Sequence, residues 1–132
     1  MTPKMNIQGI DVYIGSGASY PDVVRCISTF FGLPEEQIVK YDGPEDLDVI
    51  KHGSWAFIYK IVNSSRFSYK ADIELYRDFD WEQALEATSR ELGVEIVYPD
   101  EDHLSGDAMI SVLPDGRTQK TGLNPEDLGD DL

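Results

Sequence analysis

The chain has 132 residues, a size typical of one domain, and 41% of them are hydrophobic, which suffices for a buried core. Asp and Glu number 25 against 11 Lys and Arg, so the formal net charge is −14, which disfavours binding to nucleic acid and anionic membranes. No apolar run is long enough to cross a bilayer, no signal peptide is visible, and the lone Cys26 cannot form an internal disulfide, so we expect a cytoplasmic protein.

The first half of the chain predicts a strand, a helix and a β-hairpin. Apolar residues alternate in the strands and recur at helical spacing in the helix, which Ser19 caps and Gly32 ends. Residues 33–53 are irregular and fit a helical turn, a short strand and a second short helix. The predicted ranges are a strand at 7–14, a helix at 20–31, and hairpin strands at 54–62 and 67–76. In the strand at 67–76, one face is expected to be exposed to solvent. This face consists of Ser68, Lys70, Asp72 and Glu74.

The second half predicts another helix, a strand and a second hairpin. Asp80 and Gln83 resemble a capping box at the start of the helix, and Gly93 is a natural stop. The remaining predicted elements are a strand at 94–98, an acidic loop at 99–107, and hairpin strands at 108–113 and 117–122.

This order predicts an α+β fold with an antiparallel sheet and two helices on one face. The pattern is the ferredoxin-like βαββαβ arrangement followed by a C-terminal β-hairpin. Residues 1–122 then form a single domain, and residues 123–132 form an acidic tail that we expect to be peripheral.

The turn Gly15-Ser16-Gly17, between the first strand and helix, invites comparison with phosphate-binding loops. A P-loop ends in Lys followed by Ser or Thr, which is missing here, and Tyr20 stands where a dinucleotide fingerprint has its third glycine. Ser19 and Asp22 are expected to occupy the free N–H groups of the helix. We therefore interpret this turn as a structural corner.

No motif for catalysis or metal binding is complete. The acidic loop alternates like a calcium loop, but Leu104 and Ser111 stand where oxygen ligands are needed. Cys26 lies beside the apolar stripe of the first helix, and neither histidine belongs to a recognisable triad. We expect no cofactor, no metal and no enzymatic activity.

The charge is distributed unevenly along the chain. Residues 35–48 hold six acids and one base, residues 72–107 hold twelve acids and two bases, and residues 49–71 hold four bases and no acid. Acidic patches with neighbouring aromatic residues favour binding of a basic protein, because acids steer cations and aromatic rings supply anchors. The alternative is that the aromatic residues belong to the core and the acids only maintain solubility.

In overall character the chain resembles the immunity proteins of bacterial toxin–immunity pairs, which are small, acidic, cofactor-free α/β domains. The resemblance implies a cytoplasmic inhibitor of a basic toxin domain, often a nuclease, and it assigns no site residues. Charge alone suggests the contacts with this basic partner: Asp42, Glu45, Asp46, Asp48, Tyr98, Asp100, Glu101, Asp102 and Asp107.

Two other functions fit the same sequence. The first is a nucleic-acid mimic that inhibits a DNA-binding or defence enzyme, with carboxylates spaced like phosphates. The second is a small-molecule-binding regulatory domain that uses the glycine corner.

Overall fold

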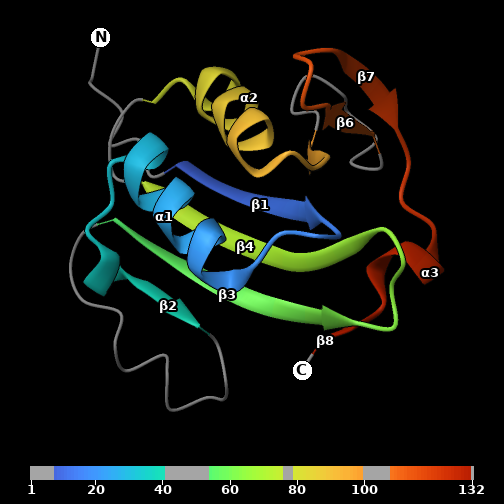
Figure 1. The fold of residues 1–132 in the computed structure, drawn as a ribbon, viewed down its shortest axis with the longest axis horizontal. Coiled ribbons are helices and arrows are strands. Elements are labelled where there is room, and N and C mark those ends of the chain that lie inside the picture. The colour runs from blue at the N-terminus through green and yellow to red at the C-terminus, as the bar shows by residue number, and fades with distance from the viewer. Residues whose placement is uncertain (1–7, 41–53, 76–78, 100–107, 132) are drawn as a thin grey trace, which may run out of the picture.

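The computed structural model describes residues 8–40, 54–75, 79–99 and 108–131. They form a mixed α+β fold with a mostly antiparallel sheet in the order β2-β3-β4-β1-β5-β6-β7, with β8 paired to β3 (Figure 1). The N-terminal elements are β1 (Gln8–Gly15), α1 (Tyr20–Phe31), a 3₁₀ turn (Glu35–Gln37), β2 (Ile38–Lys40), β3 (Trp55–Val62) and β4 (Phe67–Leu75). The C-terminal elements are α2 (Trp81–Leu92), β5 (Ile96–Pro99), β6 (Met109–Val112), β7 (Thr118–Thr121), α3 (Pro125–Leu128) and β8 (Asp130–Asp131).

The two long helices begin and end at the predicted residues. The Ser19 hydroxyl accepts the N–H of Asp22 at 3.3 Å, and an Asp80 carboxylate oxygen accepts the N–H of Gln83 at 3.2 Å. Gly32 and Gly93 both take the left-handed conformation at the C-termini, where other residues would be strained. The capping residues in the sequence therefore determine where α1 and α2 begin and end.

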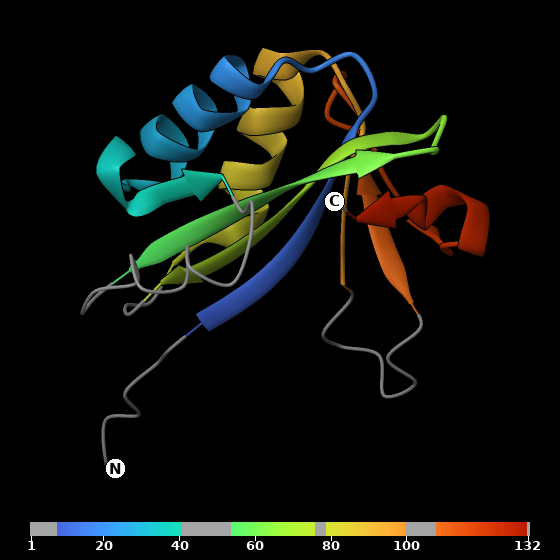
Figure 2. The ribbon, with the colours of Figure 1, turned by 90° about the horizontal axis from the view of Figure 1, so that it is seen from below.

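Helices α1 and α2 pack on one face of the sheet, and the main core lies between the helices and the sheet (Figure 2). Val23, Ile27 and Phe31 of α1 are at most 1% exposed, as is Leu85 of α2. They contact a buried apolar layer from the central strands, which includes Ile14, Ile58, Ala71, Ile73 and Ile96. Alternation along each strand thus directs one set of side chains into this core.

Part of the irregular segment at 33–53 is now defined. The helical turn at Pro34 is the 3₁₀ turn, and the short strand is β2, which pairs with β3 in the parallel direction. The short helix considered for residues 44–50 lies outside the described residues.

The C-terminal segment, expected to be peripheral, is in contact with the sheet over residues 123–131. From β7 the chain returns to β3, where β8 pairs with Ile61 and Val62. Leu123 packs on a second apolar cluster, and a Cβ atom on Gly129 would collide with the Val62 carbonyl. The second cluster consists of Ile61, Phe67, Val97 and Met109, with Tyr13 beside it.

One guanidinium joins this segment to the sheet. Arg66 donates to both carboxylate oxygens of Glu95, at 3.0 Å each, and to Asp127 at 3.2 Å. It also donates to the Thr121 hydroxyl and the Gly122 carbonyl, both at 3.1 Å. The Arg66 side chain is 23% exposed, and hydrogen bonding from it lowers the pKa of Glu95. The planar fork of arginine thus connects the β3–β4 turn, the start of β5 and the C-terminal segment.

Replacing Arg66 by lysine is expected to lower the free energy of unfolding by about 2 kcal/mol, since an ammonium cannot bond all these acceptors. Arg25→Lys, at an ion pair whose side chains are 62% and 47% exposed, is the matched control and should change it by less than about 0.5 kcal/mol. The pKa of Glu95 is lowered, so its contribution is present above the unfolded-state pKa and is lost as pH falls through the folded-state pKa. Urea denaturation at neutral pH and at pH values down through the pKa of Glu95 measures both effects. Equal losses of stability in the two variants would contradict this role of Arg66.

Candidate functional site

The glycine corner is built for packing. The Gly15 N–H donates to the Glu95 carbonyl at 2.8 Å, and a Cβ atom on Gly15 would lie only 2.8 Å from the same oxygen. Gly17 has a φ of +106°, which side-chain-bearing residues rarely adopt, and Ser16 hydrogen-bonds to the turn that carries Arg66. With Ser19 capping the helix, these contacts agree with a structural role for the corner.

Of the nine partner contacts suggested by charge, one lies in the described part of the chain. Tyr98 is 7% exposed and belongs to the main core, so its ring offers little surface to a partner. The other eight lie outside the described residues: Asp42, Glu45, Asp46, Asp48, Asp100, Glu101, Asp102 and Asp107.

A different group of charges emerges on the side of the sheet that points away from α1 and α2, here called the far face. The register of β1, β4 and β3 arranges its side chains in three rows across the strands. These rows are Gly9–Glu74–Trp55, Asp11–Asp72–Phe57 and Tyr13–Lys70–Tyr59.

Three carboxylates of the far face, called the acidic cluster, stand close together: Asp11, Asp72 and Glu74. Asp11 is directly opposite Asp72, and Glu74 follows two residues later on the same side of β4. Gly9 leaves room for Glu74, because a Cβ atom there would collide with the Glu74 carboxylate. Within the described chain, neither Asp72 nor Glu74 forms a hydrogen bond or an ion pair.

The electrostatics of the acidic cluster are unfavourable. Burial raises the pKa of Asp72, the charge of Asp11 raises it further, and Lys70 only partly offsets these effects. Burial also raises the pKa of Glu74, and the charges of Asp72 and Asp11 add to the shift. At neutral pH the fold therefore holds like charges together at a cost in stability.

Aromatic rings border the acidic cluster on β3. The Trp55 and Phe57 ring centroids are 4.9 Å apart, and those of Phe57 and Tyr59 are 6.5 Å apart. The Lys70 ammonium lies 5.5 Å from the centre of the Tyr59 ring. This lysine contacts an aromatic ring and forms no ion pair with a described carboxylate.

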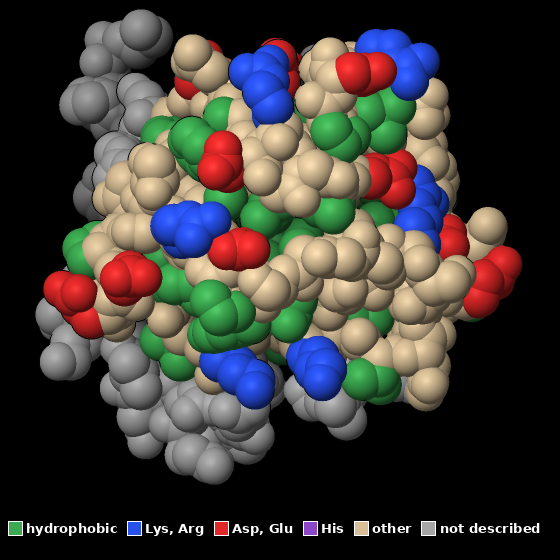
Figure 3. All heavy atoms as spheres, in the orientation of Figure 1, with side chains coloured by type: hydrophobic (Ala, Val, Ile, Leu, Met, Phe, Trp, Pro, Cys, Tyr) green, Lys and Arg blue, Asp and Glu red, His purple; other side chains and the backbone are tan. Residues whose placement is uncertain are grey.

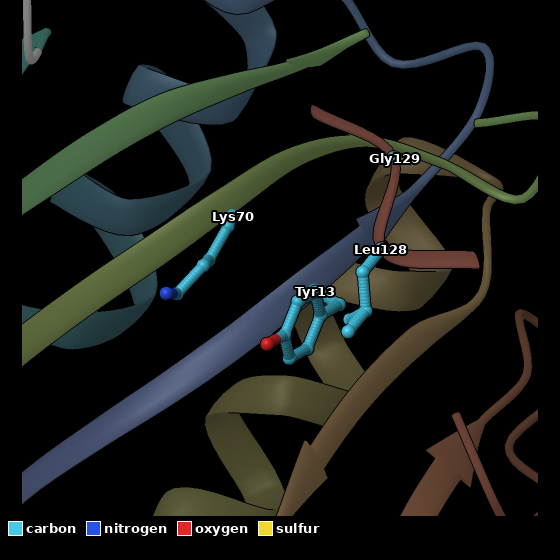
Figure 4. Close-up of a pocket in the computed structure, with 4 residues that line it drawn as sticks. All are labelled: Tyr13, Lys70, Leu128 and Gly129. Atoms are coloured by element: carbon cyan, nitrogen blue, oxygen red, sulfur yellow. The ribbon is translucent and has the colours of Figure 1, made fainter. Parts of the chain in front are cut away.

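A hollow of about 240 Å³ lies at the end of the far face, where the C-terminal segment crosses it. Its described lining is Tyr13, Lys70, Leu128 and Gly129 (Figure 4). Figure 4 shows the Leu128 side chain beside the Tyr13 ring. Leu128 is 38% exposed and is the large hydrophobic residue that the described surface leaves exposed.

The face that carries the helices has a different charge pattern. Figure 3 shows acidic and basic side chains interspersed there. Two of these acids pair with arginines on the same helix, Asp22 with Arg25 and Glu86 with Arg90, each at 2.9 Å. Glu82 and Glu91 of α2 form no ion pair with a described residue, but they lie apart as single exposed carboxylates, whereas those of the acidic cluster face one another across two strands.

The described residues were also compared with the requirements of a metal site, a membrane-spanning helix and a reactive thiol. No group of three His, Cys, Asp or Glu among them could hold a metal ion, and none of the described helices is long and apolar enough to span a membrane. Cys26 is 1% exposed, and burial raises the pKa of its thiol, which disfavours the reactive thiolate.

Comparisons with protein-family models, with curated proteins and with solved structures find no match for this chain.

Asp72→Asn is expected to raise the free energy of unfolding at neutral pH by roughly 0.5 kcal/mol, because it removes a half-buried charge that faces another carboxylate. Since the pKa of Asp72 is raised by folding, its charged form costs stability above the folded-state pKa. The gain in free energy of unfolding should therefore shrink as pH falls. It should vanish well below about pH 3.9, where Asp72 of the wild type is neutral in both the folded and the unfolded protein.

Glu36→Gln is the control for this measurement, because Glu36 is an exposed carboxylate on the turn before β2. Thermal unfolding at several pH values should show no comparable gain for the control. A neutral or destabilising effect of Asp72→Asn at pH 7 would contradict the unfavourable electrostatics inferred for the acidic cluster.

Proposed function

We propose that this protein binds and neutralises a basic protein, in the manner of an immunity protein that blocks a cognate toxin domain. The observation that carries the proposal is the acidic cluster of the far face, whose members lie together without ion pairs to described residues. Its electrostatic cost in the free protein calls for a compensating function.

A cationic partner would relieve this cost. A guanidinium or ammonium placed between Asp11, Asp72 and Glu74 would lower the pKa values of Asp72 and Glu74 and replace repulsion by charge-assisted hydrogen bonds. Residues that destabilise the free fold while serving the bound state are typical of functional sites. The same charges, within a chain of net charge −14, would accelerate encounter with a basic protein.

The surroundings of the acidic cluster support a protein as the partner. The half-buried rings of Trp55 and Tyr59 lie on one side, and the hollow with the exposed Leu128 lies at one end. Apolar anchors beside charged groups are the usual composition of a protein interface. A toxin that acts on nucleic acid would present the required basic surface, since it must bind phosphates.

We also propose the finer fold assignment and the location. The antiparallel order β3-β4-β1-β5, with α1 and α2 on one face, supports a ferredoxin-like core to which β2, β6 and β7 are added. The buried, unpaired Cys26 supports function in a reducing cytoplasm.

The test compares three forms of the tagged protein in pull-downs from the native host at low ionic strength, followed by a high-salt wash and mass spectrometry. The first form is the wild type, and the second is Asp11→Asn/Asp72→Asn/Glu74→Gln. The third, Glu35→Gln/Glu36→Gln/Glu91→Gln, removes three exposed charges on α2 and the turn before β2.

We expect one basic protein in stoichiometric amount with the wild type and the control, and at least tenfold less with the far-face variant, about 1.4 kcal/mol. The recovered partner, once purified, should lose its activity when the wild-type protein is added. Equal loss of binding in both triple variants would mean that net charge, and not the acidic cluster, is responsible for binding. Absence of any basic partner would overturn the proposed function.

A further inference from the structure

A second hollow, of about 150 Å³, lies between α2 and the strands β5 to β7. It is on the helix side of the sheet and is separate from the acidic cluster. Its described lining is Glu82, Glu86, Tyr98, Ile110, Val112 and Thr118.

The lining of this hollow combines an apolar wall with an acidic rim. The half-buried Ile110 supplies most of the apolar wall, with the edges of the largely buried Val112 and Tyr98 side chains beside it. Glu82 and Glu86 are four residues apart on α2, so they lie one above the other on one side of the helix. The hollow can therefore receive a group that is apolar along its length and positively charged at its end.

An arginine of the chain itself already occupies one end of this rim. Nη2 of Arg90 is 2.9 Å from Oε1 of Glu86, and both groups lie near Gly116 in the β6–β7 turn. Glu82, one turn earlier, forms no ion pair or hydrogen bond with a described residue and is exposed. The pair at Glu86 shows how this rim binds a guanidinium, and Glu82 is available for another.

We infer that this hollow, called the α2 groove, receives the side chain of one arginine of a basic protein partner. The methylene stem would lie against Ile110 at the floor of the hollow, and the guanidinium would reach the Glu82 carboxylate, with Glu86 beside it. Arginine fits better than lysine, because its planar fork can bond to two oxygens and its weaker hydration suits a partly apolar hollow. The inference rests on the proposed function and adds a second contact point on the opposite side of the sheet.

The experiment is an NMR titration of the isotopically labelled full chain with N-acetyl-arginine methylamide at low ionic strength. The expected result is saturable binding of roughly millimolar affinity, with shifts concentrated at the Ile110 and Val112 methyls and the Thr118 amide. Glu82→Gln should weaken the affinity about fivefold, whereas Glu91→Gln, an exposed carboxylate elsewhere on α2, should leave it unchanged.

Two further probes make the result specific. N-acetyl-norleucine methylamide, which lacks the charge, and the lysine analogue should both bind more weakly than the arginine compound. The inference is overturned by shifts that do not saturate, by equal binding of norleucine, or by the same affinity in Glu82→Gln and wild type. A negative result here leaves the proposed function standing if the far-face variant still loses the partner, so the two failures are distinguishable.

Discussion

The Arg66 guanidinium is the contact on which the position of the C-terminal segment at the end of the far face depends. It bonds to Glu95 just before β5, to Thr121 and Gly122 at the end of β7, and to Asp127 in the C-terminal segment. These contacts hold the C-terminal segment against the sheet. The hollow beside the acidic cluster exists because Leu128 and Gly129 are held there.

Two sets of carboxylates in this region, Glu95 on one hand and Asp72 with Glu74 on the other, change the stability of the fold in opposite directions when the pH falls. The pKa of Glu95 is lowered by its hydrogen bonds from Arg66, so acidification removes stability when this carboxylate is protonated. The pKa values of Asp72 and Glu74 are raised, so protonation of these groups favours the folded state. The first set stabilises the fold and the second destabilises it. Under the proposed function, a basic partner would remove the cost of the second set.

Local sequence patterns predicted the elements well and the far face only in part. Ser19, Gly32, Asp80 and Gly93 act on their own neighbours, so the bounds of α1 and α2 could be read from the chain. Alternation in residues 67–76 also placed Asp72 on the more polar face. The pairing of Asp11 with Asp72 could not be read, because it depends on the β1–β4 register, which shifts between Ile14 and Gly15. The Arg66 contacts join segments far apart in sequence, and composition alone made the C-terminal segment look like a solvated tail.

The fold holds the carboxylates of the acidic cluster in unfavourable proximity. The most direct test is a ¹³C NMR titration of the Asp72 and Glu74 carboxyl groups in the wild type and in Asp11→Asn. Both groups are expected to have raised pKa values in the wild type, and each pKa should fall when the Asp11 charge is removed. Ordinary pKa values in the wild type, unchanged in the variant, would contradict it.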